Sequence, residues 1–334
     1  TDAGDWIIDD CPNNPGTSTV DRYGCPDLDS DGVSNDNDIL PNDMSQYYDT
    51  DGDGFGDNPI GTNGDQCPDV AGVSLGDDGR FHHQTHYYSD QTYYFINADL
   101  GSGKRINTLS SDLIENNLVT SFDDYNFHES EEVNLIQSGR TWYGDNFGVV
   151  NNRTFSFNFP NITGEVYLNA EVVSNVESPA SADFTFSSTG MNTQTVNISG
   201  VSSNLSYAND GYLETTFNSN SSDIQINIGF SSNSSSSEGW IDFIELNVRR
   251  QLQMSGSQMI FRDASSVGSG IVSEFKISNA NSNLKVWDVT DPLNVQLVSG
   301  NLSSSDYSFI LNTDYLREFV AFTGGYKSVN LSGI

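Results

Sequence analysis

The sequence predicts a mainly-β protein made of three parts, and three observations support this prediction. Short runs with period-two alternation, separated by Asn, Gly and Ser, recur through most of the chain after residue 90. The 15 Tyr and 19 Phe residues favour strands over helices. Residues 1–80 carry nineteen Asp but no Glu and no Lys, so the composition changes near Gly79. We therefore expect an acidic repeat segment over 1–80, a β-sandwich over 81–250 and a smaller β-domain over 251–334.

Two short stretches of the acidic segment share one pattern. "DLDSDGVSNDND" (27–38) and "DTDGDGFGDNPI" (49–60) both read D-x-D-x-D-G, with an acidic or amide residue at the ninth place. Carboxylates at alternate positions of a tight loop can converge on one cation, and Ca²⁺ prefers six to eight oxygen ligands. Gly32 and Gly54 permit the sharp turn at position six. The spacing therefore predicts two calcium sites.

The predicted ligands follow from position in each loop, with residue seven contributing its backbone carbonyl. Position twelve is Asp38 in the first loop but Ile60 in the second, so Asp65 or another carboxylate must complete the second site. The first set is Asp27, Asp29, Asp31, Val33 and Asp38, and the second is Asp49, Asp51, Asp53, Phe55, Asp57 and Asp65.

The alternative for this segment is a solvated acidic linker, the usual role of a charge run. Two copies with the same spacing and the same glycine favour calcium instead. With its cysteines, the phrase "CP…DRYGCPDLDSDG" resembles the thrombospondin type 3 repeat over about residues 9–81. That resemblance implies a fold organised by calcium around little hydrophobic core.

The three cysteines are distributed unevenly over this repeat. Cys11 and Cys25 flank a loop that a disulfide could close in an oxidising compartment. Cys67 opens the same phrase again, but the sequence turns to "HHQTH" after Phe81. Cys67 either stays free, pairs between chains, or marks an abrupt junction between two sequences, which is the interpretation we favour.

The β-rich remainder contains two groups of predicted strands. The first group, typical of a jelly-roll-like antiparallel sandwich, is "TYYFINA", "RTFSFNFP", "GEVYLNAEVV", "ADFTFSS", "TQTVNISGV", "GYLETTFN", "DIQINIGF" and "GWIDFIELNVRRQLQM". The second is "SEFKISN", "NLKVWDVTD", "VQLVSG", "YSFILN" and "REFVAFTG". Acids in the first turn and a terminal glycine predict one helix over 129–139.

The order of phrases in this region is similar to one known family. "HHQTHYYSDQTYYFI", "FDDYNFHESEEVNLIQSGRTWYGDNF", "GWIDFIELNVRRQLQM" and "VWDVTDPLN" resemble the N-terminal, non-catalytic part of the PorU family, over about residues 81–330. These are gingipain-like sortases of the Bacteroidetes type IX secretion system. In that family a cysteine-peptidase domain follows, cleaves C-terminal sorting signals and passes cargo to lipopolysaccharide. The acidic repeats are not part of the family pattern.

Catalysis within these residues is not expected. No Cys follows Cys67 and no His follows His128, so the matching region cannot assemble a Cys–His dyad, and no catalytic residue of the family can be carried over. His82 and His86 have zinc-like i, i+4 spacing, but their surroundings favour strand and loop. The carboxylates Asp123, Asp124, Glu131 and Glu132 favour cap and surface roles over those of a glycosidase pair.

Glycans enter the predictions in two ways. Trp240, in "GWIDFIELNV", could offer a sugar-binding face in a carbohydrate-binding module, although a core position is favoured. Candidate glycosylation sites are the eight N-x-S/T sequons, a number close to chance for this composition: Asn152, Asn161, Asn197, Asn204, Asn220, Asn233, Asn301 and Asn330.

Charge narrows the class of function. The formal net charge of −33 argues against nucleic-acid partners, and no apolar run is long enough to span a membrane. We expect a secreted or cell-surface calcium-binding module that works through protein partners or self-assembly, such as a filament subunit. The alternatives are the N-terminal region of a PorU-like sortase and a carbohydrate-binding module. The sequence downstream of Ile334 would decide between module and sortase.

Overall fold

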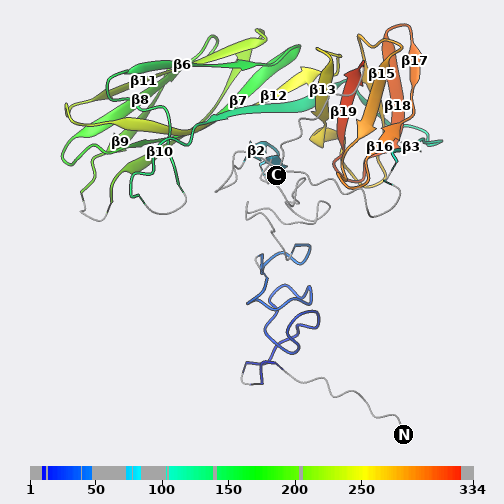
Figure 1. Ribbon diagram of the computed structural model, residues 1–334, viewed down its shortest axis with the longest axis horizontal. Helices are drawn as coiled ribbons and strands as arrows, with labels where there is room; N and C mark the ends of the chain where they lie inside the picture. The colour runs from blue at the N-terminus through cyan, green and yellow to red at the C-terminus, as the bar shows by residue number, and fades with distance from the viewer. Residues whose placement is uncertain are drawn as a thin grey trace. The chain divides into compact units, whose positions relative to one another are not determined.

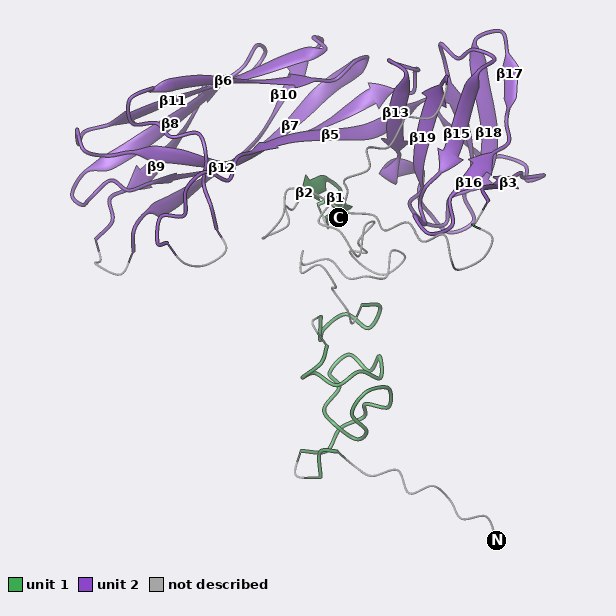
Figure 2. Ribbon diagram, in the orientation of Figure 1, with its two compact units in different colours: residues 1–103 green, residues 104–334 purple. Residues whose placement is uncertain are grey.

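The computed structural model describes residues 10–12, 14–38, 40–46, 73–76, 78–83, 103, 105–137, 141–202 and 206–324 (Figure 1). The chain divides into two compact units, Thr1–Gly103 and Lys104–Ile334 (Figure 2). This boundary lies later in the chain than the change in composition near Gly79.

The described part of the first unit consists of loops and turns with one short hairpin, in which β1 (Val73–Leu75) pairs antiparallel with β2 (Phe81–His83). Its buried hydrophobic side chains, among the described residues, are those of Cys25, Val33 and Phe81. Cys11 and Cys25 are joined by a disulfide with a Cα–Cα distance of 4.9 Å. With so few buried apolar side chains, the described loops of this unit depend on their hydrogen bonds, the disulfide and whatever neutralises their carboxylates.

The described second unit contains one nine-stranded sheet, of order β10-β7-β12-β5-β13-β19-β15-β16-β3, and two four-stranded sheets, β6-β11-β8-β9 and β17-β18-β14-β4. The elements are β3 (Asn107–Leu109), β4 (Asn117–Val119), β5 (Ser121–Glu129), β6 (Asn152–Asn158), β7 (Ile162–Ser174), β8 (Ser181–Ser187), β9 (Gln194–Ser199), β10 (Asn209–Ser219), β11 (Asp223–Ser232), β12 (Gly239–Gln251), β13 (Gln258–Arg262), the 3-10 helix η1 (Ala264–Ser266), β14 (Val272–Ile277), β15 (Leu284–Asp288), β16 (Gln296–Val298), β17 (Asn301–Ser303), β18 (Asp306–Asn312) and β19 (Glu318–Thr323).

Strict alternation builds the first core. In β11, Ile224, Ile226 and Ile228 are buried while the residues between them are exposed. The sheet β6-β11-β8-β9 packs these side chains against apolar residues of β7, β10 and β12, in one cluster that runs from Phe147 to Val248. Side chains of period two on facing sheets are the pattern of a β-sandwich.

The second core is held by stacked phenylalanines. Phe275 stacks on Phe309 and Phe261 on Phe319, each pair with ring centroids 5.1 Å apart. Its members come from β4 and β5 before the first core and from residues 252–321 after it. The first core is therefore nested, in sequence, within the second.

An ionic cluster joins the two cores, and we call it the arginine seam: Asp123, Asp124, Arg249, Arg250 and Asp263. Arg249 Nη1 lies 2.7 Å from Asp123 Oδ1 and 2.5 Å from Asp263 Oδ1, and Arg250 Nη1 lies 2.6 Å from Asp124 Oδ2. Strands β5 and β13 pair there at a single position, Asp123 with Arg262. The nine-stranded sheet is therefore held together at this point by the ion pairs of the arginine seam as well as by the backbone pairing of β5 with β13.

The mainly-β prediction is confirmed, and the described residues contain no α-helix. The helix expected over 129–139 is wrong for its described part. Glu129 ends strand β5, and Val133 forms an antiparallel bridge with Tyr143. Gly144 in turn exchanges backbone hydrogen bonds with Ile241. Pairing with the sheet satisfies these backbone groups, which overrides a local preference for helix.

Candidate metal centre

The loop over residues 27–38 turns sharply at the position that the pattern gives to glycine. Gly32 has φ +101°, in the left-handed region, and a Cβ there would lie 2.9 Å from Val20 Cγ2. The backbone conformation therefore favours glycine at this position, whereas the exposed Val20 side chain could move aside. Asn35, at the ninth place, accepts a hydrogen bond from Leu28 N at 2.8 Å and closes the loop.

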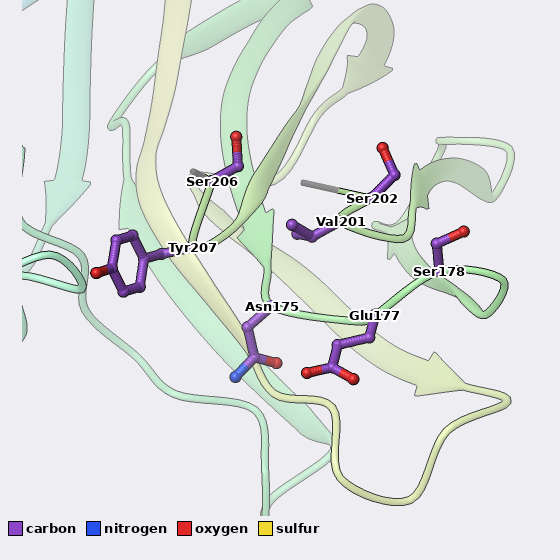
Figure 3. A pocket seen from close by; sticks show the side chains of 7 residues that line it. All are labelled: Asn175, Glu177, Ser178, Val201, Ser202, Ser206 and Tyr207. Atoms are coloured by element: carbon purple, nitrogen blue, oxygen red, sulfur yellow. The ribbon is translucent and has the colours of Figure 1, made fainter. Parts of the chain in front are cut away.

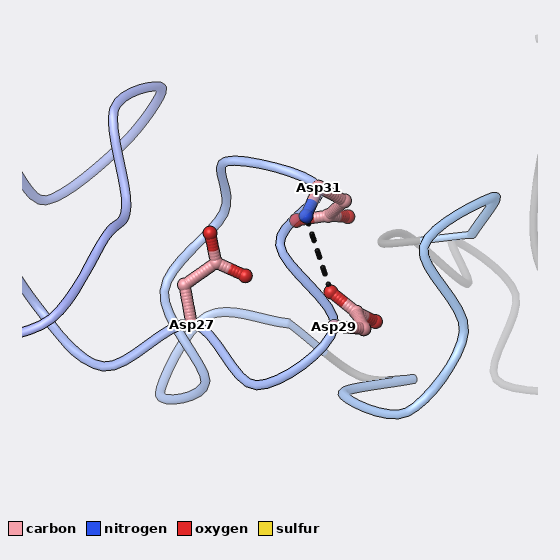
Figure 4. Close-up of side chains that lie close together, drawn as sticks. All are labelled: Asp27, Asp29 and Asp31. Carbon is pink, nitrogen blue, oxygen red and sulfur yellow. Dashed lines mark hydrogen bonds between the residues drawn. The ribbon is translucent and has the colours of Figure 1, made fainter.

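The turn brings carboxylates together. One oxygen each of Asp27, Asp29 and Asp31 lies within 4.8 Å of the others (Figure 4). Each oxygen of Asp27 accepts one backbone hydrogen bond, from Ser30 N at 2.8 Å and from Gly32 N at 3.1 Å, and keeps a lone pair for a further partner. We call Asp27, Asp29, Asp31 and Asp38 the carboxylate cluster.

Three carboxyl groups of this cluster share one arrangement. In Asp29, Asp31 and Asp38 the Oδ1 atom accepts a backbone N–H, at 3.3, 2.7 and 2.8 Å respectively. The Oδ2 atoms of the same three groups are buried and have no hydrogen-bond partner among the described residues. Buried oxygens of this kind are costly unless another group binds them.

The electrostatics agree with the geometry. Burial raises the pKa of Asp31, and the neighbouring Asp29 and Asp27 raise it further. Burial likewise raises the pKa of Asp38, and the negative charges of Asp29 and Asp31 raise it further. A divalent cation would reverse this repulsion. The oxygen-only donor set fits a hard cation such as Ca²⁺.

Sequence reasoning missed the residue that fastens this loop. Asp21 accepts hydrogen bonds from Ser34 N at 2.8 Å, Ser34 Oγ at 2.7 Å and Asn37 Nδ2 at 2.7 Å. Burial acts to raise the pKa of Asp21, but these bonds hold it well below its usual range. Asp21 lies outside the D-x-D-x-D pattern, so spacing gave no signal for it.

The other predicted ligands divide into two groups. Val33 is buried within the loop, and its N–H is the donor to Asp31. The second loop, with Asp49, Asp51, Asp53, Phe55, Asp57 and Asp65, lies outside the described residues, as do Cys67 and His86.

The remaining candidates have ordinary partners. His82 Nε2 lies 3.1 Å from Asp78 Oδ1. Asp123 and Asp124 belong to the arginine seam, and Glu132 accepts a hydrogen bond from Ser130 Oγ at 3.2 Å. Trp240 is only 6% exposed, so its ring offers no face to a sugar.

Six of the eight sequons fall within the described residues. Five of these asparagines are exposed and Asn161 is half-buried, whereas Asn204 and Asn330 lie outside. The five exposed ones are Asn152, Asn197, Asn220, Asn233 and Asn301.

The fold is that of a β-rich module with two cores. Comparison with solved structures finds a protein whose fold is similar over most of this chain. The chain is similar to dimeric latent PorU from Porphyromonas gingivalis, with a TM-score of 0.64 and 20% identity, covering 76% of this chain and 27% of that one. The similarity shows a PorU-like fold, and this chain matches about a quarter of the length of PorU.

Two weaker likenesses are to carbohydrate-binding modules. CBM36 in complex with calcium and xylotriose gives a TM-score of 0.23 at 16% identity, covering 37% of this chain and 98% of that one. The CBM36-1 domain of a xylanase from the hindgut metagenome of Trinervitermes trinervoides gives a TM-score of 0.25 at 15% identity, covering 37% of this chain and 95% of that one. No family model and no curated protein matches the chain. Within the described residues, no helix is long and apolar enough to cross a membrane.

Proposed function

We propose that this protein is a non-catalytic, calcium-binding module of the extracellular cell surface, in which an acidic repeat segment precedes a PorU-like β-region. One observation carries the calcium part of the proposal. Three buried carboxylate oxygens of the carboxylate cluster have no partner among the described residues. A cation would bind these oxygens, whose burial without a partner is otherwise unfavourable.

Calcium would be held by Asp27, Asp29, Asp31, Asp38 and the carbonyl of Val33. The repeated spacing in residues 49–65 supports a second ion of the same kind. Both sites fit the thrombospondin type 3 resemblance of the sequence. When bound, the ions would supply the positive charge that the segment otherwise lacks and would fix its loops.

The β-region would serve contact rather than chemistry. The PorU-like fold and the matching phrases support assigning it to the N-terminal part of a PorU-like sortase or to a structural protein that uses the same module. In either case the sequence places no Cys–His dyad in it. PorU is described as dimeric, which supports self-association of this chain as well. The long edge strand β10 offers backbone groups for strand addition.

Calcium titration of the whole chain, stripped with chelator and followed by calorimetry, tests the metal proposal. We expect two or more ions in the wild type and at least one fewer in Asp31→Ala. Asp36→Asn is the matched control, because Asp36 lies in the same loop but pairs with Arg22 on the surface. An unchanged stoichiometry in Asp31→Ala would contradict the assignment.

Sedimentation of the calcium-loaded chain tests the assembly proposal separately. We expect a concentration-dependent dimer or larger species. A monodisperse monomer over the accessible concentrations, with no partner recovered by crosslinking on cells, would rule assembly out.

A further inference from the structure

Polar groups of separate segments meet at several places in the described residues. One is a pocket at an end of the first sandwich, beside the connections β7 to β8 and β9 to β10 (Figure 3). Its Tyr207 ring extends away from the Asn175 and Glu177 side chains, so these groups do not converge on one ligand. A closer convergence lies in the first unit, where residues 11–25, the disulfide loop, contact residues 27–38, the cluster loop.

Backbone hydrogen bonds join these two loops at a turn. Thr19 N and Val20 N both donate to Gly32 O, at 2.8 and 2.9 Å. Gly32 is the residue at which the cluster loop turns, with φ +101°. The disulfide loop therefore supports the turn that brings the D-x-D-x-D carboxylates together.

Side chains of the disulfide loop add two further links. Asp21 accepts three hydrogen bonds of 2.7–2.8 Å, two from Ser34 and one from Asn37. Bonds to a carboxylate are among the stronger hydrogen bonds, and three of them fix one side chain. Arg22 forms a single ion pair with Asp36, whose side chain is 75% exposed, so solvent screens it. Asp21 is therefore the main side-chain link between the loops.

Asp21 acts on the ligands through the backbone that it holds. Ser34 directly follows Val33, whose carbonyl is a proposed ligand. Asn37 directly precedes Asp38, whose N–H donates to Ser34 O at 2.9 Å. Position twelve must return to the ion after this turn, so Asp38 depends on the turn being held in place. Removing partners that orient metal ligands in this way typically lowers metal affinity about 10–100-fold.

The disulfide fixes the loop that presents Asp21. Cys25, which is buried, donates its N–H to Ser18 Oγ at 2.9 Å and accepts at its carbonyl from Ser18 N at 3.1 Å. Gly24 N donates to Ser18 O at 3.0 Å, so this stretch closes on itself beside the bond to Cys11. Because the described residues of this unit bury few apolar side chains, little else would hold the loop in shape after reduction.

Building on the proposed calcium function, we propose that the Cys11–Cys25 disulfide controls the calcium affinity of the cluster loop, with Asp21 as the positioning residue between them. A dithiol that reduces the bond supplies two electrons and two protons, becomes a cyclic disulfide itself and leaves two cysteine thiols. The disulfide loop then loosens, Asp21 no longer holds the turn, and calcium is bound less tightly. By linkage, bound calcium must make the disulfide harder to reduce by the same factor.

Equilibrium dialysis of the whole chain against calcium, oxidised and in dithiothreitol, tests this coupling. The background Asp51→Ala/Cys67→Ala leaves one complete predicted calcium loop and only the two paired cysteines. We expect reduction to raise the dissociation constant about tenfold or more. Asp21→Asn should raise it about as much in the oxidised chain, and reduction should then add little.

Asp36→Asn is the matched control, because it breaks the other side-chain link between the same loops, the ion pair with Arg22. It should change the constant by about threefold at most, as expected for an exposed pair. Equal calcium affinity in the oxidised and reduced chains would overturn the coupling, as would Asp21→Asn binding as tightly as Asp36→Asn. Absence of calcium binding by the oxidised background chain would instead overturn the calcium function, and the coupling with it.

The reverse effect separates positioning by Asp21 from simple stabilisation of the fold. The same chain is equilibrated with oxidised and reduced dithiothreitol, with and without saturating calcium, and the disulfide fraction is read by mass spectrometry after thiol blocking. Calcium should raise the dithiol-to-disulfide ratio at half-reduction about tenfold or more, the factor found by dialysis. In Asp21→Asn this shift should be largely lost. An undiminished shift in that variant would show that Asp21 does not transmit the coupling.

Discussion

The carboxylate cluster of the first unit and the arginine seam of the second both crowd aspartates together, but they differ in what surrounds them. In the seam, every aspartate lies within 2.7 Å of an arginine nitrogen. In the cluster, no Lys or Arg pairs with any of the four aspartates among the described residues, and Arg22 pairs instead with Asp36. The chain has only 13 Lys and Arg against 46 Asp and Glu. In the arginine seam, two of these arginines lie on strand β12, which holds them beside the aspartates.

The difference shows two ways to bury carboxylates. A guanidinium needs a rigid frame that fixes both partners, and the paired strands β5 and β12 supply one. The described loops around the carboxylate cluster bury few apolar side chains and have no such frame, so an ion that gathers oxygens from the loop itself suits them better. We therefore expect removal of calcium to destabilise the carboxylate cluster and removal of an arginine to destabilise the seam.

Chelation should have the largest effect. Removing calcium with EGTA should expose the amides of residues 10–46 to rapid hydrogen exchange, because the carboxylate cluster then repels itself. The second unit should keep its protection. Hydrogen-exchange mass spectrometry with and without chelator measures both units in one sample. Equal protection of residues 10–46 in the two conditions would remove the distinction between the regions.

Loss of the disulfide between Cys11 and Cys25 should have the second-largest effect on stability. A loop of about 15 residues stabilises a fold by about 3 kcal/mol in the chain-entropy model. The double variant Cys11→Ala/Cys25→Ala should lower the free energy of unfolding of the first unit by about that amount at saturating calcium. Denaturant titration measures it, with Cys67→Ala as the control. A similar loss in the control would argue against the pairing of Cys11 with Cys25.

Breaking the arginine seam should cost somewhat less. Arg249→Met leaves Asp263, which is 5% exposed in its side chain, without its guanidinium. Since Arg249 is itself 34% exposed, we discount the penalty for a buried pair to about 2 kcal/mol. A double-mutant cycle with Asp263→Asn, read from thermal unfolding of the second unit, isolates the pair. Additive effects in the cycle would mean that the two groups are not coupled.

The smallest effect is expected at the surface of the second core. Lys276 Nζ lies 2.9 Å from Asp306 Oδ2, but both side chains are exposed. Solvent screens such pairs, so Lys276→Ala should leave the unfolding midpoint unchanged within error. A clear shift would show that charge pairing stabilises this unit outside the seam as well.

Local patterns predicted much of this molecule. Alternation in stretches such as "DIQINIGF" located strands of both cores, and the D-x-D-x-D-G spacing located the carboxylate cluster. Strand β5 was not among the predicted strands, because Asp123, Asp124 and Asn126 interrupt its apolar pattern. Those aspartates are explained by arginines more than 120 residues away, which no window of sequence contains.

The same limit applies to the sites. The helix expected over 129–139 followed local propensity, whereas in its described part Glu129 pairs with the sheet and Glu132 and Val133 bond to Tyr143. Asp21 stabilises the loop from outside the D-x-D-x-D-G pattern.

The nested order of the two cores has a consequence for synthesis on the ribosome. The first core needs nothing beyond strand β12 and can close once residue 251 has emerged. The second core forms later, because β3 and β4 pair with strands made much later in synthesis. Asn117 bonds to Ser273 across 156 residues, and Asn107 pairs with Gln296. During that interval β3 and β4 lack the strands with which they pair, β16 and β14. Because unpaired strands in folding intermediates tend to aggregate, we expect slow synthesis of residues 120–298 to lower the yield of folded protein.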